Sequence, residues 1–337
     1  DETLLTDKPY VIYDSLVVKP EATLTLAEGT TLMFHDKAAL HVYGKLLVKG
    51  SIEKPVVLRG DRMDHMFDYL LYDNTPSRWE GIVIHRGSLG NELFQCDLHS
   101  SCFGIIVEDT EETVPDETKP SVTLDGCILH NIGGDGLQLN NCVSRVTNTQ
   151  VSNTLGHTVS ISGGSHIFIY STLAQFYPFT ANRGDALHLA SSEDGADYGL
   201  LRKAHCINCV ITGYGQDVIM GENIPDDGSC SYLFYHSFLG TPAVDDEEHF
   251  AGCVFDQDKK KGEEEKLVRQ ENFVLFDTEN FIYDFTPKDS SLIRSLADPA
   301  YEGLPLFDRK GVSRLADECP DAGCYEYMAP PDEEGEP

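Results

Sequence analysis

The chain has 337 residues, of which 41% are hydrophobic, enough to form a sizeable core. It carries 25 Lys and Arg against 56 Asp and Glu, and the net charge of -31 excludes nucleic acid and anionic membrane surfaces as partners, because both require basic patches. No apolar run approaches the roughly 18 residues needed to span a membrane.

The N-terminal residues 1–59 read as short strands that turn at glycines. Leu24 and Leu26 are followed sixteen residues later by Leu40 and Val42, within ATLTLAEGTTLMF and AALHVYGKLLVKG. Short alternating strands with a glycine at the corner are typical of the turns of a coil.

The central part of the chain repeats more visibly, in segments that begin near residues 96, 126, 149, 171 and 208. The positions taken as equivalent are Cys96, Cys127, Thr149, Thr172 and Cys209. The steps between them are 31, 22, 23 and 37 residues, which a unit near 22 residues with loop insertions explains. The sequence therefore predicts an all-β fold: a right-handed parallel β-helix (a solenoid) with loop insertions and a C-terminal closing segment.

We expect one β-helix domain over residues 1–328. Its expected parts are N-terminal coils (1–59), an insertion (60–78), central coils (79–255), a charged loop (256–271), and C-terminal coils with a closing segment (272–328). The acidic segment 109–120 interrupts the central coils, and 329–337 read as a disordered tail.

Small residues fall at matching positions of the coils. Asn131 and Asn153, 22 residues apart, predict a ladder at one corner, because asparagine tolerates the left-handed conformation and bonds its own backbone. Cys96 and Cys127 become neighbours in the stack, where we expect buried small residues, with a disulfide as the alternative.

Both ends of the chain resemble a known group. TLLTDKPYVIYDSLVV, EATLTLAEGTTLMFHDKAALHVYGKLLVKGS, KPVVLRGDRMDHMFDYLLYD and RWEGIVIH resemble the opening of right-handed parallel β-helix surface lipoproteins (pectin-lyase-like fold) of Gram-negative gut anaerobes. The end resembles the D-x-x-G-x-x-R…D-x-G-x-Y-E pattern of bacterial β-helix proteins, which is filled by Asp308, Gly311, Arg314, Asp321, Gly323, Tyr325 and Glu326.

The resemblance implies an exported protein of the outer membrane or cell surface. Membrane contact is expected only through a lipid anchor upstream of residue 1, outside this chain. The chain opens with DETLLTDKPY and no signal peptide, so we expect it to be processed or trimmed. The expected partners are a polysaccharide or glycan, or outer-membrane proteins.

The same fold hosts pectin lyases, polygalacturonases and sugar epimerases, and fold alone does not confer their activities. Of the polygalacturonase set N-T-D, D-D, G-H-G and R-I-K, the chain has only Gly156-His157, followed by Thr158. Lyases of this fold need a basic residue beside calcium-binding acids, and the repeats hold few basic residues. The sequence predicts no metal site and no cofactor, and no motif supports calcium.

One row of acids and histidines could still carry chemistry. Asp135, His157 and Asp185 each stand two residues before a paired apolar motif, so they would line one sheet edge on successive coils. Asp217 follows with a register ambiguous by one residue, and such a slip turns a side chain to the other face. These four are the predicted catalytic residues of a glycosidase or lyase, because carboxylates one or two coils apart approach glycosidase spacings. The alternative is turn chemistry, in which Asp caps backbone amides.

Aromatic residues gather in the insertion AQFYPFTANRGD next to this row. Phe176, Tyr177 and Phe179 predict a sugar platform, because rings stack on the apolar faces of sugars. Arg183 and His188 complete the predicted ligand-binding set. Alternatively, the rings fill the coil where it widens.

Three functions follow. The first is a non-catalytic surface protein that binds a glycan or serves as a subunit of an outer-membrane lipoprotein assembly. The second is a carbohydrate-active enzyme, a glycosidase or polysaccharide lyase. The third is a purely structural acidic spacer.

Overall fold

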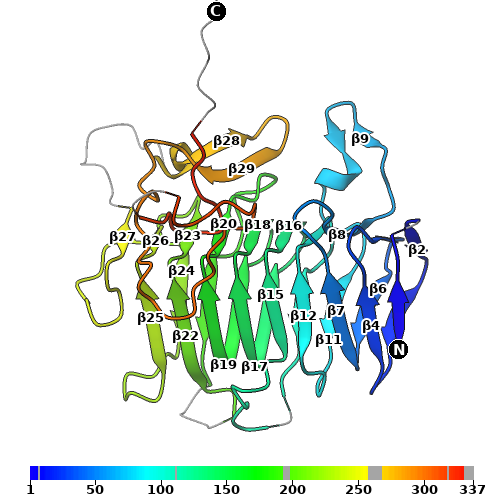
Figure 1. Cartoon of the computed structure of the whole chain (residues 1–337), viewed down its shortest axis with the longest axis horizontal. Helices are drawn as coiled ribbons and strands as arrows, with labels where there is room; N and C mark the ends of the chain where they lie inside the picture. The colour runs from blue at the N-terminus through cyan, green and yellow to red at the C-terminus, as the bar shows by residue number, and fades with distance from the viewer. Residues whose placement is uncertain (7, 111, 193–197, 257–267, 317–318, 330–337) are drawn as a thin grey trace, which may run out of the picture.

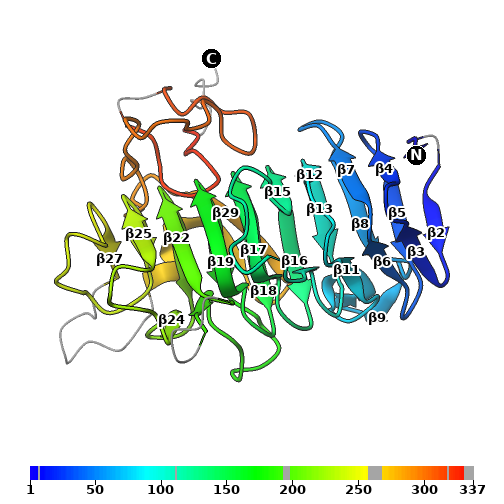
Figure 2. The ribbon, with the colours of Figure 1, turned by 90° about the horizontal axis from the view of Figure 1, so that it is seen from below.

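The computed structural model describes the chain except residues 7, 111, 193–197, 257–267, 317–318 and 330–337. In the described part the chain forms β-strands and short 3-10 turns, and no α-helix. Parallel coils stack in chain order along one long axis (Figures 1 and 2). The predicted all-β parallel β-helix is confirmed.

Each coil contributes strands to three faces, here called faces 1, 2 and 3. Face 1 contains β3 (Ser15–Val18), β6 (Ala39–Val42), β11 (Gly81–Ile84), β14 (Ile105–Val107), the first part of β17 (Leu137–Thr147) and of β19 (Val159–Ile169), β21 (Leu187–Ala190) and β24 (Ile219–Glu222). Face 2 contains β1 (Glu2–Leu4), β4 (Thr23–Leu26), β7 (Lys45–Lys49), β12 (Asn91–Phe94), β15 (Val122–Asp125), the ends of β17 and β19, β22 (Leu201–Ile207) and β25 (Ser231–Tyr235). Because β17 and β19 run through both faces, faces 1 and 2 form one 15-stranded sheet.

Face 3 is a separate 10-stranded parallel sheet. It contains β2 (Tyr10–Ile12), β5 (Thr31–Phe34), β8 (Val56–Gly60), β13 (Cys96–His99), β16 (Ile128–Ile132), β18 (Gln150–Thr154), β20 (Thr172–Gln175), β23 (Val210–Gly213), β26 (Phe238–Leu239) and β27 (Val254–Phe255). This face carries the insertions described below.

The core consists of aliphatic columns inside the coils. On face 1, strand register aligns the buried residues Leu40, Ile82, Ile105, Leu137, Val159 and Leu187. Each such buried side chain stabilises the fold by about 1.5–3 kcal/mol relative to an exposed one. Side chains along a strand point alternately into and out of the solenoid. The residues that flank these core positions on each strand therefore point outward, where they can contact a ligand.

The corner between faces 2 and 3 repeats one local geometry. The chain turns at a residue of positive φ, namely Gln95, Gly126, Asn148, Tyr170, Asn208 or His236. The following residue is Cys, Thr or Ser. At five of these corners its side chain donates to the carbonyl two residues earlier, as in Thr149 to Thr147 (2.8 Å) and Cys209 to Ile207 (3.3 Å). Cys96, Cys127 and Cys209 are therefore buried thiols that share the corner position with hydroxyl residues, and no disulfide joins Cys96 to Cys127.

One predicted equivalence is wrong by one residue. Thr172 pairs with Gln150, so Ser171, and not Thr172, occupies the corner position of Thr149. The hydroxyl of Ser171 makes the corner hydrogen bond to Ile169 (3.1 Å). The step is thus 22 residues, the same as the preceding one.

The predicted asparagine ladder lies at the other end of face 3. Asn131 and Asn153 both have φ of 54°. They are aligned because the residues on either side of Asn131 pair with those on either side of Asn153. Asparagine occupies left-handed backbone at lower cost than other non-glycine residues, as expected from its short polar side chain.

Two excursions project from the same edge of the solenoid (Figure 1). The predicted insertion 60–78 forms the hairpin of β9 (His65–Phe67) and β10 (Leu70–Leu71), then the 3-10 turn η1 (Tyr72–Asn74). Beyond the last coil, η3 (Val268–Asn272) leads into the antiparallel hairpin of β28 (Phe273–Asp277) and β29 (Ile282–Pro287), where further coils were expected. Most of the predicted charged loop and of the predicted tail lies outside the described residues.

The C-terminal segment then returns along the corner between faces 2 and 3. The side-chain amides of Gln95, Asn148 and Asn208 donate to its carbonyls at Arg309, Phe307 and Asp298, respectively. The order shows that the segment runs back toward the N-terminal coils.

The motif residues at the C-terminal end form a network of salt bridges and turn hydrogen bonds. Arg314 is buried and donates to Glu326 and to Asn148, with its guanidinium 3.5 Å from the ring centre of Tyr170. The carboxylate of Asp308 accepts the backbone N–H of Glu326. The motif therefore fastens the closing segment to the coils.

Candidate functional site

The four residues predicted to be catalytic stand in register. Leu137, Val159, Leu187 and Ile219 pair in succession across β17, β19, β21 and β24. Asp135, His157, Asp185 and Asp217 each lie two residues earlier in the chain. The ambiguity at Asp217 is thereby resolved, and the row occupies successive coils.

Hydrogen bonds within the row serve the backbone. Asp135 accepts the backbone N–H of His157 (2.8 Å), and His157 Nδ1 accepts the backbone N–H of Asp185 (2.9 Å). Since Nδ1 of His157 is an acceptor, the neutral ring carries its proton on Nε2. Asp217 accepts the hydroxyl of Thr241 (2.6 Å) and the N–H of Ile219. These contacts correspond to the turn chemistry that was the alternative at the sequence level.

A cavity of about 280 Å³ lies beside the last two carboxylates of the row. Asp185, Asp217, Arg183 and Tyr214 contribute to its walls. The guanidinium of Arg183 lies 4.6 Å from the ring centre of Tyr214 and donates to the carbonyl of Thr180. Predicted ligand-binding Arg183 therefore belongs to this cavity.

His188 lies on the outer side of face 1. Its ring stacks on that of His157 with 4.5 Å between centroids, and its Nε2 is 3.4 Å from a carboxylate oxygen of Glu222. His188 thus contacts both neighbouring coils, through its ring on one side and through Nε2 on the other.

The three predicted sugar-stacking rings divide between core and surface. Phe176 is fully buried and packs edge-on against Phe276 and Tyr214, so its assignment to a ligand platform is wrong. The hairpin β28–β29 covers this ring. The sequence around Phe176 could not predict this cover, because the hairpin comes from a distant part of the chain. Tyr177 is 5% exposed, whereas Phe179 is 41% exposed.

Phe179 belongs to an apolar groove of about 460 Å³ between the two excursions. We call it the aromatic groove, and its rings are Phe67, Tyr69, Tyr177, Phe179 and Phe281. Phe67 and Tyr69 stack with 5.8 Å between centroids, and Phe179 stacks on Phe281 at 5.1 Å. Phe67 and Tyr69 are 55% and 68% exposed, so the groove presents ring faces to solvent.

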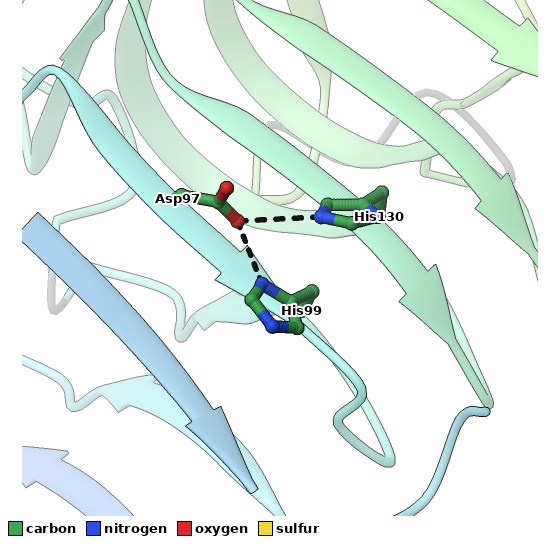
Figure 3. Close-up of side chains that lie close together, drawn as sticks. All are labelled: Asp97, His99 and His130. Atoms are coloured by element: carbon green, nitrogen blue, oxygen red, sulfur yellow. Dashed lines mark hydrogen bonds and ion pairs between the residues drawn. The ribbon is translucent and has the colours of Figure 1, made fainter. Parts of the chain in front are cut away.

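A second cluster lies on the outer side of face 3, under the insertion. We call Asp97, His99 and His130 the His–Asp cluster (Figure 3). Asp97 and His99 are two residues apart on β13 and point outward together, while His130 is the register partner of His99 on β16. Asp97 Oδ1 lies 2.7 Å from His99 Nδ1 and 3.3 Å from His130 Nε2.

The insertion covers the His99 side of this cluster. Asp73 of η1 places Oδ1 3.0 Å from His99 Nε2, and Arg59 of β8 lies 2.8 Å from the same oxygen. Burial lowers the pKa of His99, but the contacts with Asp97 and Asp73 outweigh burial and raise it to about 9. Burial opposes ionisation of Asp97, yet His99 and His130 hold its pKa well below the usual range.

The sequence repeat itself implies that the two histidines of this cluster are neighbours, although they were not among the predicted site residues. His99 and His130 each stand three residues after an equivalent cysteine, in CDLH and CILH. Equivalence of Cys96 and Cys127 therefore implies adjacent imidazoles. Asp73 carries no such signal, because an insertion has no register with the coils.

In the part of the chain that the structure describes, no helix has the length and apolar character needed to cross a membrane. Compared with known proteins, the chain matches no protein-family model, no curated protein and no solved structure.

Proposed function

We propose that this protein is an exported cell-surface β-helix that binds an uncharged glycan in the aromatic groove, without catalysis. The observation that carries the proposal is the set of solvent-facing rings in one open groove. Aromatic rings present a flat apolar surface that stacks on the C–H faces of sugar rings.

Charge favours an uncharged chain as the occupant. The net charge of -31 repels polyanionic sugars such as polyuronates. The groove itself is lined by apolar and hydroxyl-bearing residues, with Arg78 as its one charged lining residue among those described. Export and a surface location rest on the resemblance of the opening of the chain to surface lipoproteins.

Affinity electrophoresis through gels that contain soluble neutral polysaccharides, such as mannan, xyloglucan and β-glucan, tests the proposal. We expect at least one of these polymers to retard the wild-type protein. Tyr69→Ala and Phe179→Ala should each weaken binding roughly tenfold, because one stacked ring contributes about 0.5–1.5 kcal/mol beyond its buried area.

Tyr13→Ala is the matched control. Tyr13 is 75% exposed and lies on an N-terminal coil outside the groove, so its removal should leave retardation unchanged. Equal mobility of wild-type and groove variants in every gel would contradict glycan binding in this groove.

A second candidate function is glycoside hydrolysis in the cavity of Asp185, Asp217 and Arg183. It is favoured by one observation, the two in-register carboxylates that line one cavity. Release of reducing sugar from any of the same polysaccharides that disappears in Asp185→Ala would establish this function in place of simple binding.

A further inference from the structure

We propose that the His–Asp cluster binds one divalent transition-metal ion of the zinc type, through Asp97 Oδ1, His99 Nδ1 and His130 Nε2. This inference is independent of the glycan proposal. It concerns other residues, on the outer side of face 3 beneath η1.

The three donor atoms lie close together. Three potential ligand atoms, one from each residue, lie within 4.8 Å of one another (Figure 3). Two imidazole nitrogens and one carboxylate oxygen form a donor set that zinc and its first-row neighbours bind. Because metal–ligand bonds of about 2.0–2.2 Å place tetrahedral donors roughly 3.3–3.5 Å apart, the 3.3 Å between Asp97 and His130 already fits. The 2.7 Å between Asp97 and His99 has to open by roughly 0.6 Å.

The sheet holds these donors in place. His99 and His130 occupy paired positions on adjacent strands, so their separation is set by the strand spacing. Below β13, Trp79 is fully buried, stacks on Phe34 at 4.3 Å and donates to the carbonyl of His99 (2.8 Å). The backbone beneath the cluster is therefore fixed by core packing.

The partner of the second His99 nitrogen also suits a metal ligand. His99 Nε2 faces Asp73 Oδ1 at 3.0 Å, and Arg59 holds the same carboxylate. A ligating histidine commonly donates its other N–H to a carboxylate, which orients the ring and increases its basicity. Asp73 is thus a positioning residue for His99.

Access and charge agree with this assignment. The side chains of Asp97 and His130 are each 28% exposed, so an ion reaches the cluster from solvent without unfolding. Two carboxylates and one guanidinium surround the rings and leave one net negative charge beside them. An ion that binds His99 Nδ1 displaces the proton between this atom and Asp97 Oδ1, while Nε2 keeps its proton toward Asp73.

Isothermal titration calorimetry of the chelator-treated full chain with ZnCl₂ tests the site. We expect one ion per chain in the wild type, and a loss of affinity of roughly 10- to 100-fold or more in His130→Ala and in Asp97→Asn, which preserves the shape of the side chain. Asp73→Asn should give a smaller loss. Co²⁺ should produce a visible ligand-field absorption in the wild type that His130→Ala abolishes.

His41→Ala is the matched control. His41 also belongs to a histidine pair, with Nδ1 3.0 Å from His85 Nε2, but it lies on face 1 outside the cluster. Its variant should bind zinc as the wild type does. The assignment is overturned if the wild type takes up no zinc, if folded His130→Ala and Asp97→Asn keep wild-type affinity, or if His41→Ala loses as much affinity as they do.

Discussion

Nε2 of His99 lies 3.0 Å from Oδ1 of Asp73, and this contact joins the insertion to face 3. The same carboxylate oxygen is 2.8 Å from the guanidinium of Arg59, which belongs to the strand before the insertion. A single carboxylate therefore ties the 3-10 turn of the insertion to two strands of the solenoid, next to residues 75–78 that line the aromatic groove.

Asp73→Ala should loosen the insertion and destabilise the fold. The change leaves the buried imidazole of His99 and the guanidinium of Arg59 without their shared acceptor, at an expected cost of about 1–3 kcal/mol. Hydrogen exchange should rise in residues 60–78 more than in the coils. Asp68→Ala, at an exposed position of the same insertion, is the control, and an equal effect there would contradict the assigned role of Asp73.

Stability should fall between pH 6.5 and pH 4 because of His166. This ring is buried, donates from Nε2 to the carbonyl of Gly163 (2.8 Å) and accepts the hydroxyl of Ser144 at Nδ1 (2.9 Å). Burial lowers its pKa to about 4. In this interval the unfolded chain takes up a proton that the native ring does not, so the free energy of unfolding should decrease by about 3 kcal/mol as pH falls.

Urea titrations at several pH values measure this effect. His166→Gln removes the titrating group and should show a shallower dependence than the wild type over the same interval. Parallel curves for the two proteins would show that His166 is not the cause.

Arg314→Ala should be among the most damaging single substitutions. It removes a buried cation from Glu326, Asn148 and the ring of Tyr170, and loss of one partner of a buried ion pair costs about 3–5 kcal/mol. Arg86→Ala breaks an exposed pair with Asp109 and should cost at most about 1 kcal/mol. Chemical denaturation of both variants measures the difference in the free energy of unfolding. Similar losses of stability would contradict the role of Arg314 in fastening the closing segment to the coils.

Cys209→Ser should be tolerated, because Ser171 and Ser237 occupy the equivalent corner positions of neighbouring coils and make the equivalent hydrogen bond. Cys209→Leu should destabilise by about 1–3 kcal/mol through overpacking of a fully buried position. Thermal denaturation compares the two variants. Equal melting temperatures for the two variants would contradict the assignment of Cys209 to a buried corner position that accepts serine.

The repeat length was sufficient to predict the parallel β-helix and the alignment of Asp135, His157 and Asp185. These features depend on register, which a sequence period encodes directly. The single slip, at Ser171 and Thr172, arose because two adjacent hydroxyl residues both satisfy the corner pattern, and only strand pairing separates them.

The aromatic groove could be predicted only in part. Phe179 was identified from its own insertion, but Tyr69 and Phe281 come from excursions whose positions follow from tertiary packing and not from periodicity. The same reason explains Phe176, which was predicted to be exposed and is covered by a hairpin almost one hundred residues later in the chain.

The aromatic groove has walls from three stretches that are far apart in the chain, whereas every coil beneath it is built from short-range register. Replacing the loop that forms one wall would thus change which ligand the groove binds, without disturbing the aliphatic columns of the core. The solenoid is a scaffold, and the excursions are variable segments that determine binding. Grafting a different hairpin between β8 and β11 is therefore a direct way to change the binding specificity.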